Sequence, residues 1–272
     1  MQLEVLLSCM NQKDTSLVEK SRITGNVLII NQCINYVGEQ MAYILPYKKM
    51  ITTSESGLSR SRNLAIQHAQ GEICLICDDD ELLEPDYQDT ILQAFQRYPQ
   101  ADVIAFGVKG KETRLAGRVQ KLGRLGCLKI VSYQIAFRRE IIQKQNLKFD
   151  INMGAGSGNG CGEENKFLLD CLKAGLKIYY VPQIIAEVIP KSSTWFFGYD
   201  STFFYQRGGA TRYMLGTIMS LAYGIYYLLA KRRLYLSTIS TFNATKQLLK
   251  GIWDNPIKKR ICSEKVDIQW KQ

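Results

Sequence analysis

The feature that most constrains the fold is a regular alternation of short apolar runs and helix-like segments over residues 3–108. Five runs have the length and composition of buried strands: 3–8, 27–31, 48–53, 73–77 and 103–108. Three intervening segments carry helix start signals: 14–22, 59–69 and 85–98. Continuous apolar runs that alternate with helices are typical of a parallel sheet covered on both faces. We therefore expect an α/β domain with a mostly parallel, Rossmann-type sheet flanked by helices.

The fourth apolar run leads directly into four acidic residues, Asp78, Asp79, Asp80 and Glu81. Adjacent carboxylates repel one another, so a cation is expected beside them. At a strand end, Asp78 and Asp80 point the same way and Asp79 points the other way. Such a pair of hard oxygen ligands suits Mg²⁺ or Mn²⁺ and leaves coordination positions open for phosphate. A solvated turn after a strand is the alternative interpretation.

Polar residues follow the first four strands, and ligands of open α/β sheets bind beyond the carboxyl ends of the strands. We expect four short segments to meet in one crevice: 8–11, 31–32, 54–57 and 78–80. Residues 152–162 contain a glycine at every second position from Gly154 onward, which indicates a loop that orders over a ligand. Residues 110–126 are basic and rich in glycine, and indicate a second loop.

The composition limits the chemistry that this chain can perform. Histidine occurs only at position 68, so serine–histidine–aspartate, cysteine–histidine and multi-histidine metal sites are not expected. Carboxylates must therefore do any acid–base work. The eight cysteines are scattered, several of them in apolar runs, which indicates reduced, buried thiols of a cytoplasmic protein. Residues 1–10 contain Glu4 and no basic cluster, so no signal peptide is expected.

The positive charge of the chain is concentrated in its C-terminal part. Residues 191–272 contain thirteen basic and four acidic residues, and therefore carry +9 of the net charge of +10. An anionic membrane surface or a pyrophosphate group is the expected partner of such a segment. Nucleic acid is not expected as a partner, because no recognition motif accompanies the charge.

Residues 213–230 contain no charged side chain, and three basic residues follow at 231–233. Three interpretations remain open: a helix buried in the protein, a helix lying in or shallowly inserted into a membrane interface, and a short transmembrane span. Gly216, Ser220 and Gly224 form a stripe of small residues that suits close packing against another helix.

Several motifs, in order and at matching spacing, resemble family-2 glycosyltransferases with the GT-A fold. Residues 57–63 read Gly-x-x-x-x-Arg-Asn at a predicted helix start, and residues 78–87 place Asp-x-Asp before Pro-Asp-Tyr. Residues 162–164 read Gly-Glu-Glu, again at a predicted helix start, where the family has Gly-Glu-Asp. The resemblance covers residues 3–190. Residues 191–272 resemble enzymes of cell-surface polysaccharide synthesis only in being a basic, hydrophobic C-terminal segment.

The resemblance implies roles for the carboxylates. Asp80, with Asp78, would hold Mn²⁺ or Mg²⁺, and Asp78 would contact the donor ribose or a metal-bound water. Glu164 would be the base that deprotonates the acceptor hydroxyl, and Glu163 would support acceptor binding. Asp79 is expected in the donor site with them. On position alone, Glu163 and Glu164 are equally ordinary first-turn acids of a helix.

Basic and polar side chains complete the expected nucleotide-sugar site. Arg60, Arg62 and Asn63 lie at a helix N-terminus, where anions bind readily, and an arginine there would contact the base or the diphosphate. Pairing with the acids at the sheet end is an equal alternative for the two arginines. Three further residues follow the first two strands and are expected to line the same site: Ser8, Asn11 and Asn31.

The chain departs from the family at the predicted base site. Residues 31–33 read Asn-Gln-Cys where the family usually has Asp-Asp-Gly-Ser, whose first aspartate reads uracil. The identity of the base therefore stays open, with a UDP-sugar favoured over dTDP- and GDP-sugars. Glu164 stands where an aspartate is commoner, and its extra methylene would shift the base relative to the acceptor.

The resulting hypothesis is an inverting, metal-dependent glycosyltransferase with two parts. Residues 1–190 would form the GT-A domain, and residues 191–272 a helical, basic, membrane-associating region. The acceptor would be a polyprenyl-diphosphate-linked saccharide of bacterial capsule or exopolysaccharide synthesis. The enzyme would be cytoplasmic, at the inner face of the cell membrane, as a peripheral or monotopic protein.

Two alternatives belong to other functional classes. A nucleotidyltransferase would share the α/β architecture and the metal-binding acids, but it usually has a glycine-rich loop after the first strand, and residues 8–16 contain no glycine. A non-catalytic module docked on the membrane would explain the missing uracil-reading aspartate. It would not explain why both acidic motifs are intact.

Overall fold

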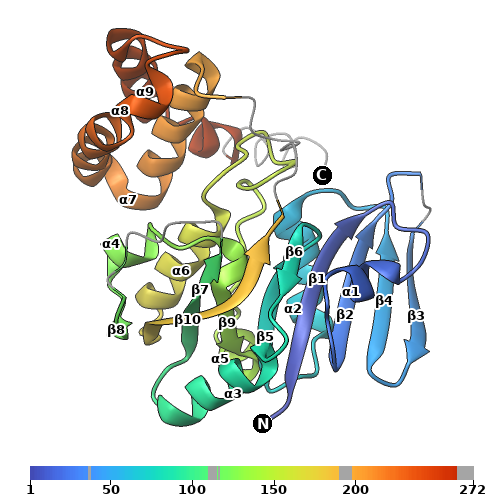
Figure 1. Cartoon of the computed structure of the whole chain (residues 1–272). Coiled ribbons are helices and arrows are strands. Elements are labelled where there is room, and N and C mark those ends of the chain that lie inside the picture. The colour runs from blue at the N-terminus through green and yellow to red at the C-terminus, as the bar shows by residue number, and fades with distance from the viewer. Residues whose placement is uncertain (36–37, 110–114, 116, 190–197, 262–272) are drawn as a thin grey trace. The chain divides into compact units, whose positions relative to one another are not determined.

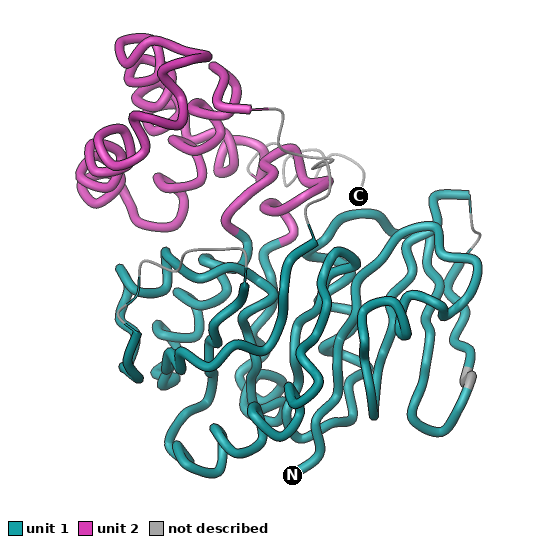
Figure 2. The backbone as a smooth tube through the Cα atoms, in the orientation of Figure 1, with its two compact units in different colours: residues 1–150, 163–191 teal, residues 151–162, 192–272 magenta. Residues whose placement is uncertain are grey.

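The computed structural model describes residues 1–35, 38–109, 115, 117–189 and 198–261 (Figure 1). It divides the chain into two compact units (Figure 2). Unit 1 consists of residues 1–150 and 163–191, and unit 2 consists of residues 151–162 and 192–272. The glycine-rich segment 151–162 therefore groups with the C-terminal region, although residues of unit 1 precede and follow it in the chain.

Unit 1 is built on a ten-stranded sheet with the order β3-β4-β2-β1-β5-β9-β7-β10-β6, and β8 pairs with β10. Its parallel part consists of four strands: β1 (Leu3–Met10), β2 (Asn26–Gln32), β4 (Lys48–Thr53) and β5 (Ile73–Asp78). β1 is central, and its Ser8 lies opposite both Ile30 and Asp78. This register brings the carboxyl ends of β1, β2 and β5 to one edge, as the sequence predicts.

Six further strands extend or interrupt the parallel part: β3 (Glu39–Leu45), β6 (Glu81–Leu83), β7 (Val103–Lys109), β8 (Gln120–Lys121), β9 (Ile135–Arg138) and β10 (Ile178–Val188). β7 and β10 are parallel to each other, whereas β3, β6, β8 and β9 pair only antiparallel with their neighbours. The sheet is therefore mixed. β10 continues through Pro182, because a register shift after Val181 accommodates the missing N–H.

Helices cover both faces of the sheet, which confirms the expected α/β fold class. α1 (Ser16–Lys20) and α3 (Tyr87–Arg97) pack on one face with Val5, Leu7 and Leu75. The opposite face is covered by four helices: α2 (Leu58–His68), α4 (Arg124–Cys127), α5 (Arg139–Lys144) and α6 (Glu163–Lys173). Neighbouring residues Val5 and Leu6 belong to different core clusters, because successive side chains of a strand point to opposite faces.

The predicted loop over residues 110–126 has more structure than the sequence indicates. Within 110–126, the residues outside the described part are 110–114 and 116, and the described remainder includes β8 and the start of α4. A short 3₁₀ turn, η1 (Ser132–Gln134), then leads into β9. Gly175 follows the end of α6 with a φ of 86°, as is typical of a C′ glycine.

Unit 2 is a helical assembly built on α7 (Ser201–Ala230), α8 (Arg232–Tyr235) and α9 (Thr241–Asp254). α7 and α9 pack along each other, and their common core contains Phe204, Tyr227, Leu248 and Ile252. The starts of α7 and α9 are capped. The Asp200 carboxylate accepts a hydrogen bond from the Phe203 N–H at 2.7 Å, and Oγ of Ser240 accepts one from the Asn243 N–H at 3.3 Å. Residues 190–197 and 262–272, which include part of the basic C-terminal segment, lie outside the described residues.

α7 is bent sharply at Gly216, where φ is 78° and ψ is −179°. Only glycine adopts this backbone conformation readily, so Gly216 divides the helix into segments 201–215 and 217–230. Among the described residues, α7 is the one helix long and apolar enough to cross a membrane by length and composition. Each segment, however, is only about 21–23 Å long at 1.5 Å per residue, which is shorter than a hydrocarbon core of about 30 Å.

Candidate active site

A buried arginine joins the two acidic motifs of unit 1. The side chain of Arg62, on α2, is fully buried. Its Nη2 donates to both carboxylate oxygens of Asp78 at 2.9 Å, and its Nη1 donates to Oε1 of Glu163 at 3.0 Å. The ring of Phe149 lies beneath the guanidinium, with its centroid 5.3 Å from Cζ. The end of β5 and the start of α6 are thus held by one cation.

The charges around Arg62 explain how its charged guanidinium can be buried away from solvent. Burial alone would lower the pKa of Arg62, but the charges of Asp78 and Glu163 outweigh burial and raise that pKa above its ordinary value. Two carboxylates close to one guanidinium leave a net negative charge before any other acid is counted. An unpaired charge buried in this way would cost several kcal/mol, so the three side chains depend on one another.

Two serine hydroxyls frame the arginine–carboxylate network. Oγ of Ser132, in η1, donates to Oδ2 of Asp78 at 3.2 Å. Oγ of Ser61 donates to Oγ of Ser8 at 2.8 Å, and both serines are buried. The second contact ties α2 to the carboxyl end of β1, next to the strand that carries Asp78. The side chains of β1, α2, β5, η1 and α6 are therefore brought together as one cluster.

Further carboxylates make the cluster strongly acidic. Burial, and then the charge of Asp78, raises the pKa of Glu81 well above its ordinary value. Burial, and then the charges of Glu81, Asp80, Asp78 and Glu164, raises the pKa of the Tyr133 hydroxyl. The Tyr133 hydroxyl therefore lies within range of the charges of both acidic motifs.

Glu164 lies at the start of α6, beside the carboxylate that Arg62 holds, and its side chain is half-buried. Burial, and then the charge of Glu163, raises the pKa of Glu164, while Arg62 opposes this shift. A carboxylate with a raised pKa is a stronger base than an exposed glutamate. In this environment Glu164 can accept a proton, whereas Glu163 is committed to Arg62.

The donor set at the end of β5 fits a divalent cation bound in an open site. Among the described residues, no group of three or more histidine, cysteine, aspartate or glutamate side chains forms a closed metal site. Mg²⁺ and Mn²⁺ beside phosphates, however, are usually held by one or two carboxylates, waters and phosphate oxygens. Asp80 offers a hard oxygen donor, Asp78 is shared with Arg62, and Oε2 of buried Glu81 has no hydrogen-bond partner among the described residues.

Two predicted ligand-binding amides instead hold the backbone. Oδ1 of Asn31 accepts from the Gln12 N–H at 2.9 Å, and its Nδ2 donates to the Gln12 carbonyl at 2.8 Å. Asn63 makes the same kind of pair with Phe149, whose N–H and carbonyl lie 2.7 and 2.8 Å from its amide atoms. Asn31 thus fixes the segment that follows β1, and Asn63 fixes the segment that follows α5. Their donor-site roles remain predictions that would require these pairs to rearrange.

The remaining predicted residues lie outside the arginine network. Arg60 is exposed, although it lies only two positions before buried Arg62. Asn11 is exposed as well, and its φ of 52° places it in a left-handed turn directly after β1. The charge of Asp79 helps to raise the pKa of Cys9, after burial, so its carboxylate lies toward β1. Of the two alternatives for the arginines, pairing with sheet-end acids describes Arg62.

Sequence reasoning missed two serine side chains that shape this region, and it placed Gln32 in the predicted crevice without naming a partner for it. Ser61 and Ser132 contact the predicted site residues Ser8 and Asp78. Nε2 of Gln32 donates to the carbonyls of Glu55 and Gly57 at 2.6 and 3.2 Å, and so joins β2 to the start of α2. Polar residues at the carboxyl end of a strand or beside an arginine were the only signal available, and that signal is weak.

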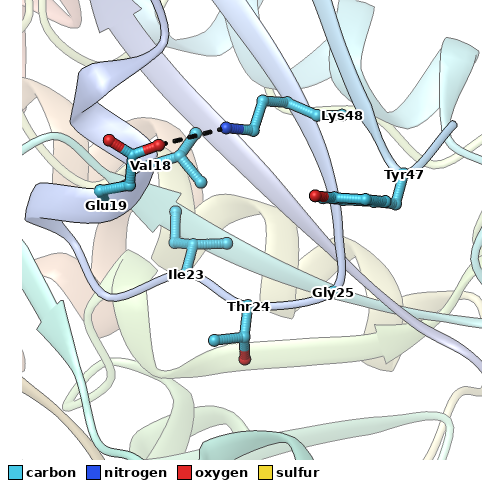
Figure 3. A pocket seen from close by; sticks show the side chains of 7 residues that line it. All are labelled: Val18, Glu19, Ile23, Thr24, Gly25, Tyr47 and Lys48. Carbon is cyan, nitrogen blue, oxygen red and sulfur yellow. Dashed lines mark ion pairs between the residues drawn. The ribbon is translucent and has the colours of Figure 1, made fainter. Parts of the chain in front are cut away.

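An open hollow of about 400 Å³ occurs elsewhere in unit 1 and is lined by seven residues: Val18, Glu19, Ile23, Thr24, Gly25, Tyr47 and Lys48 (Figure 3). It lies at the amino ends of β2 and β4, at the opposite edge of the sheet from Asp78. Lys48 and Glu19 close part of it with an ion pair of 3.6 Å. Because α/β sheets bind ligands at the carboxyl ends of their strands, we do not assign the nucleotide site to this hollow.

Comparison with known proteins agrees with the fold. Residues 39–159 match the model of the family described as Glycosyl transferase family 2. No curated protein sequence matches the chain. The structure of S. aureus TarS 1–349 in complex with UDP-GlcNAc has a TM-score of 0.61 at 10% identity, covering 93% of this chain and 82% of that chain.

A second similar structure is the mannosyltransferase PcManGT from Pyrobaculum calidifontis in complex with GDP-Man and Mn²⁺. Its TM-score is 0.52 at 12% identity, and the match covers 92% of this chain and 85% of that chain. At such identities the likeness concerns the fold alone. The family match therefore concerns residues 39–159, and the two structures show the same fold.

Proposed function

We propose that this chain is an inverting glycosyltransferase that moves one sugar from a nucleotide sugar to a hydroxyl of a lipid-linked saccharide. The observation that carries the proposal is the pairing of Arg62 with both Asp78 and Glu163. It joins the Asp-x-Asp end of β5 to the acidic start of α6, at the carboxyl edge where α/β sheets bind ligands. The family match over residues 39–159 supports the same activity.

The reaction assigns separate tasks to the two acidic motifs. The acceptor oxygen attacks the anomeric carbon, the bond from that carbon to the diphosphate breaks, and the diphosphate leaves with the electron pair. Glu164 takes the acceptor proton, and its raised pKa suits this role. Glu163, held by Arg62, keeps the start of α6 in place and contributes to acceptor binding. Attack from the face opposite the leaving group inverts the anomeric centre.

The donor is proposed to bind at the ends of β1, β2 and β5. Asp80 and Asp78 would hold Mn²⁺ or Mg²⁺, an ion that stabilises the negative charge of the departing diphosphate when bound. Asp78 would also contact the ribose, and Arg60, exposed at the start of α2, is placed to meet an anion from solvent. Uracil is the favoured base of the donor, since the similar TarS structure holds UDP-GlcNAc.

The acceptor class follows from the charge of the C-terminal region. Residues 191–272 carry most of the net charge, and a lipid-diphosphate-linked saccharide presents an anionic group at a membrane surface. We place the enzyme in the cytoplasm, at the inner face of the cell membrane, with residues 1–190 as the catalytic domain. The product would be an intermediate of a bacterial capsule or exopolysaccharide.

Donor binding and hydrolysis provide the first test. The purified full-length chain is incubated with Mn²⁺ or Mg²⁺ and a panel of UDP-, dTDP- and GDP-sugars, and melting temperature and free nucleotide are measured. We expect a metal-dependent rise in melting temperature and slow hydrolysis with one donor, since a ligand of the native state stabilises it. A folded protein that responds to no donor contradicts the proposal, and pyrophosphate release from a nucleoside triphosphate would indicate a nucleotidyltransferase instead.

The assignment of the base is tested with Glu164→Gln. This change keeps the shape of the side chain and removes its basicity, so transfer should fall by a factor on the order of 10² or more while the donor-induced melting shift persists. Glu140→Gln is the matched control, because Glu140 is also an acid in the first turn of a helix, but it is exposed on α5. Full transfer by Glu164→Gln would show that another group takes the proton.

A further inference from the structure

The second segment of α7 exposes a continuous apolar stripe. Ile218, Leu221, Ile225 and Leu229 are all exposed, and Ile218 and Leu229 reach exposed fractions of 82% and 70%. Their spacing of three, four and four residues places them on one side of the helix. The stripe therefore runs along the whole segment instead of being a single exposed side chain.

The opposite side of the same segment is packed inside unit 2. Ser220, Gly224, Tyr227 and Leu228 are buried, and a Cβ on Gly224 would lie 2.7 Å from a methyl carbon of Leu248 on α9. Residues 213–230 carry no charge on either side. A helix that is apolar all round but buried on only one side still leaves its other side to be covered.

The outer side of α9 combines apolar and basic side chains. Phe242, Lys246, Leu249 and Trp253 follow one another at spacings of four, three and four residues, and all four are exposed. The exposed fractions of Phe242 and Trp253 are 76% and 85%. Aromatic and basic residues on one side of an amphipathic helix are typical of helices that lie in a membrane interface. We call the two stripes together the apolar face of unit 2.

Positive charge borders this apolar face. Arg232 and Arg233 follow α7 directly and are exposed, and Lys250 lies next to Leu249 on α9. Lysine is depleted at the core of protein–protein interfaces, whereas basic residues beside an apolar surface attract anionic lipid head groups. The charge pattern therefore favours an anionic membrane over a second protein as the partner of this face.

We infer that unit 2 binds anionic membranes by shallow insertion of its apolar face, as a kinked helical hairpin and not as a transmembrane span. The bend at Gly216 leaves segments too short to cross the bilayer, and α9 packs against α7 on both sides of the bend. Insertion to the depth of the head groups would bury the apolar stripes and leave the basic residues among the lipid phosphates. The inference concerns unit 2 alone, so it does not depend on the proposed transferase activity.

Vesicle binding of the full-length chain tests this inference without any sugar donor. Flotation is measured with phosphatidylcholine vesicles and with vesicles that also contain phosphatidylglycerol, at low and high salt. We expect binding to the anionic vesicles and weaker binding at high salt. Ile225→Ser and Trp253→Ser should each weaken binding about tenfold, and Arg232→Gln with Arg233→Gln should weaken binding to anionic vesicles on the order of tenfold.

Matched controls come from unit 1. Ile34→Ser and Leu125→Ser remove side chains that are also exposed, and Lys144→Gln with Lys177→Gln removes two exposed charges. These variants should bind vesicles as the unaltered chain does. Equal binding by the unit 2 variants would overturn the inference. The inference would also be overturned if the chain did not bind vesicles and instead formed a dimer in solution that the unit 2 variants dissociate.

The depth of insertion separates the interfacial arrangement from a span. Changing Trp195 and Trp270 to phenylalanine leaves Trp253 as the sole indole of the chain. Its fluorescence should shift to the blue on vesicle binding, and quenchers attached near the head groups should act more strongly than quenchers at the chain ends. Stronger quenching from the bilayer centre would contradict shallow insertion of α9. Cysteines introduced just before and just after residues 213–230 that a membrane-impermeant reagent labels from opposite sides of the vesicle would indicate a span of α7.

Discussion

Nη1 of Arg62 lies 3.0 Å from Oε1 of Glu163, although the two residues are 101 positions apart in the chain. Because Nη2 of the same guanidinium contacts Asp78, the pair connects α6 to the acid-bearing end of β5. Neither acid could be buried this far without the arginine, and the arginine could not be buried without them. The position of the predicted base, Glu164, therefore depends on a residue that need not touch substrate.

Replacing Arg62 should affect both stability and catalysis. Arg62→Gln leaves the buried Glu163 and the half-buried Asp78 without a cation, so we expect a loss of about 3–5 kcal/mol in the free energy of unfolding. Arg62→Lys keeps the charge but not the two-armed geometry, so it should fold, lose about tenfold or more in transfer rate, and show a smaller loss of stability. Urea unfolding and transfer assays check both expectations.

The control for this pair of variants is Arg60→Gln, because Arg60 belongs to the same helix but is exposed. We expect it to change the free energy of unfolding by no more than about 0.5 kcal/mol. Arg62→Gln with unaltered stability would mean that the two carboxylates find another partner.

The metal assignment predicts a selective defect in Asp80→Asn. This change removes a hard anionic ligand but leaves the Arg62–Asp78–Glu163 network intact. Loss of an outer-shell partner already lowers metal affinity by about 10–100-fold, so loss of a direct ligand should lower Mn²⁺ affinity by at least about 100-fold. Thermal unfolding with UDP and increasing Mn²⁺ measures this affinity.

Asp89→Asn serves as the matched control for the metal experiment, because Asp89 is an exposed acid on α3. It should retain the Mn²⁺-dependent shift in melting temperature. If Asp80→Asn retains that shift as well, the divalent ion is bound elsewhere or by the nucleotide alone.

The raised pKa of Glu164 predicts opposite pH trends for activity and stability. As a base, Glu164 must be deprotonated, so kcat/KM should fall with decreasing pH already well above the pKa of about 4.3 of an ordinary glutamate. The folded state binds this proton more tightly than the unfolded state does. The contribution of Glu164 to stability is therefore full below about pH 4.3 and is lost as pH rises through its raised pKa.

These trends separate Glu164 from other acids of the chain. In Glu164→Gln, the stability that the unaltered protein loses with rising pH should be retained, while activity is low at every pH. pH–rate profiles and urea unfolding across the same pH range provide both readouts. An activity profile that falls only near pH 4 in the unaltered protein would argue against a shifted glutamate as the base.

The contact between α7 and α9 predicts a strong effect of small substitutions. A Cβ on Gly251 would lie 2.0 Å from the Tyr205 carbonyl oxygen, and a Cβ on Gly208 would lie 2.1 Å from that of Leu248. Both positions are at helix backbone contacts that cannot yield without separating the helices. We expect Gly251→Ala to destabilise unit 2 by about 1–3 kcal/mol or more.

Thermal unfolding followed by circular dichroism measures this effect, and Gly123→Ala is its control. Gly123 has no neighbouring atom within 4 Å of an added Cβ, and its φ of −101° is accessible to alanine. We expect this control to melt like the unaltered protein. A Gly251→Ala variant that also melts unchanged would show that the helices are not in backbone contact.

Segment 152–162 has tertiary partners that the sequence alone did not indicate. Its glycines predict a loop that orders over a ligand, yet within unit 2 the guanidinium of Arg260 donates to the Ser157 carbonyl, and Met153 is buried beside Ala210 and Ile257. These partners come from residues more than fifty positions later in the chain. No local pattern could indicate that the segment before Glu163 would be held by the C-terminal helices.

Local patterns in the sequence determined the α/β alternation, most strand positions and the acidic end of β5. Continuous apolar runs report burial on both faces, and the predicted strand over residues 48–53 coincides with β4. Strand β3 (Glu39–Leu45) was not predicted, although five of its seven residues are apolar. A turn directly after β5 was one of the two interpretations of Asp78–Asp80, but the short strand β6 that follows the turn was not predicted.

Only the tertiary structure decided which charged residues pair and which stay in solvent. Arg60 and Arg62 are equivalent by composition and nearly so by position, but two residues correspond to about 200° of rotation around a helix, so one faces the sheet and the other faces water. The same holds for Gly216 and Gly224, of which one bends α7 and the other admits Leu248. The sequence determined which chemical groups are available, and the packing of distant segments determined their partners. A charged side chain, or a glycine backbone without a side chain, can be buried only where a complementary surface packs against it.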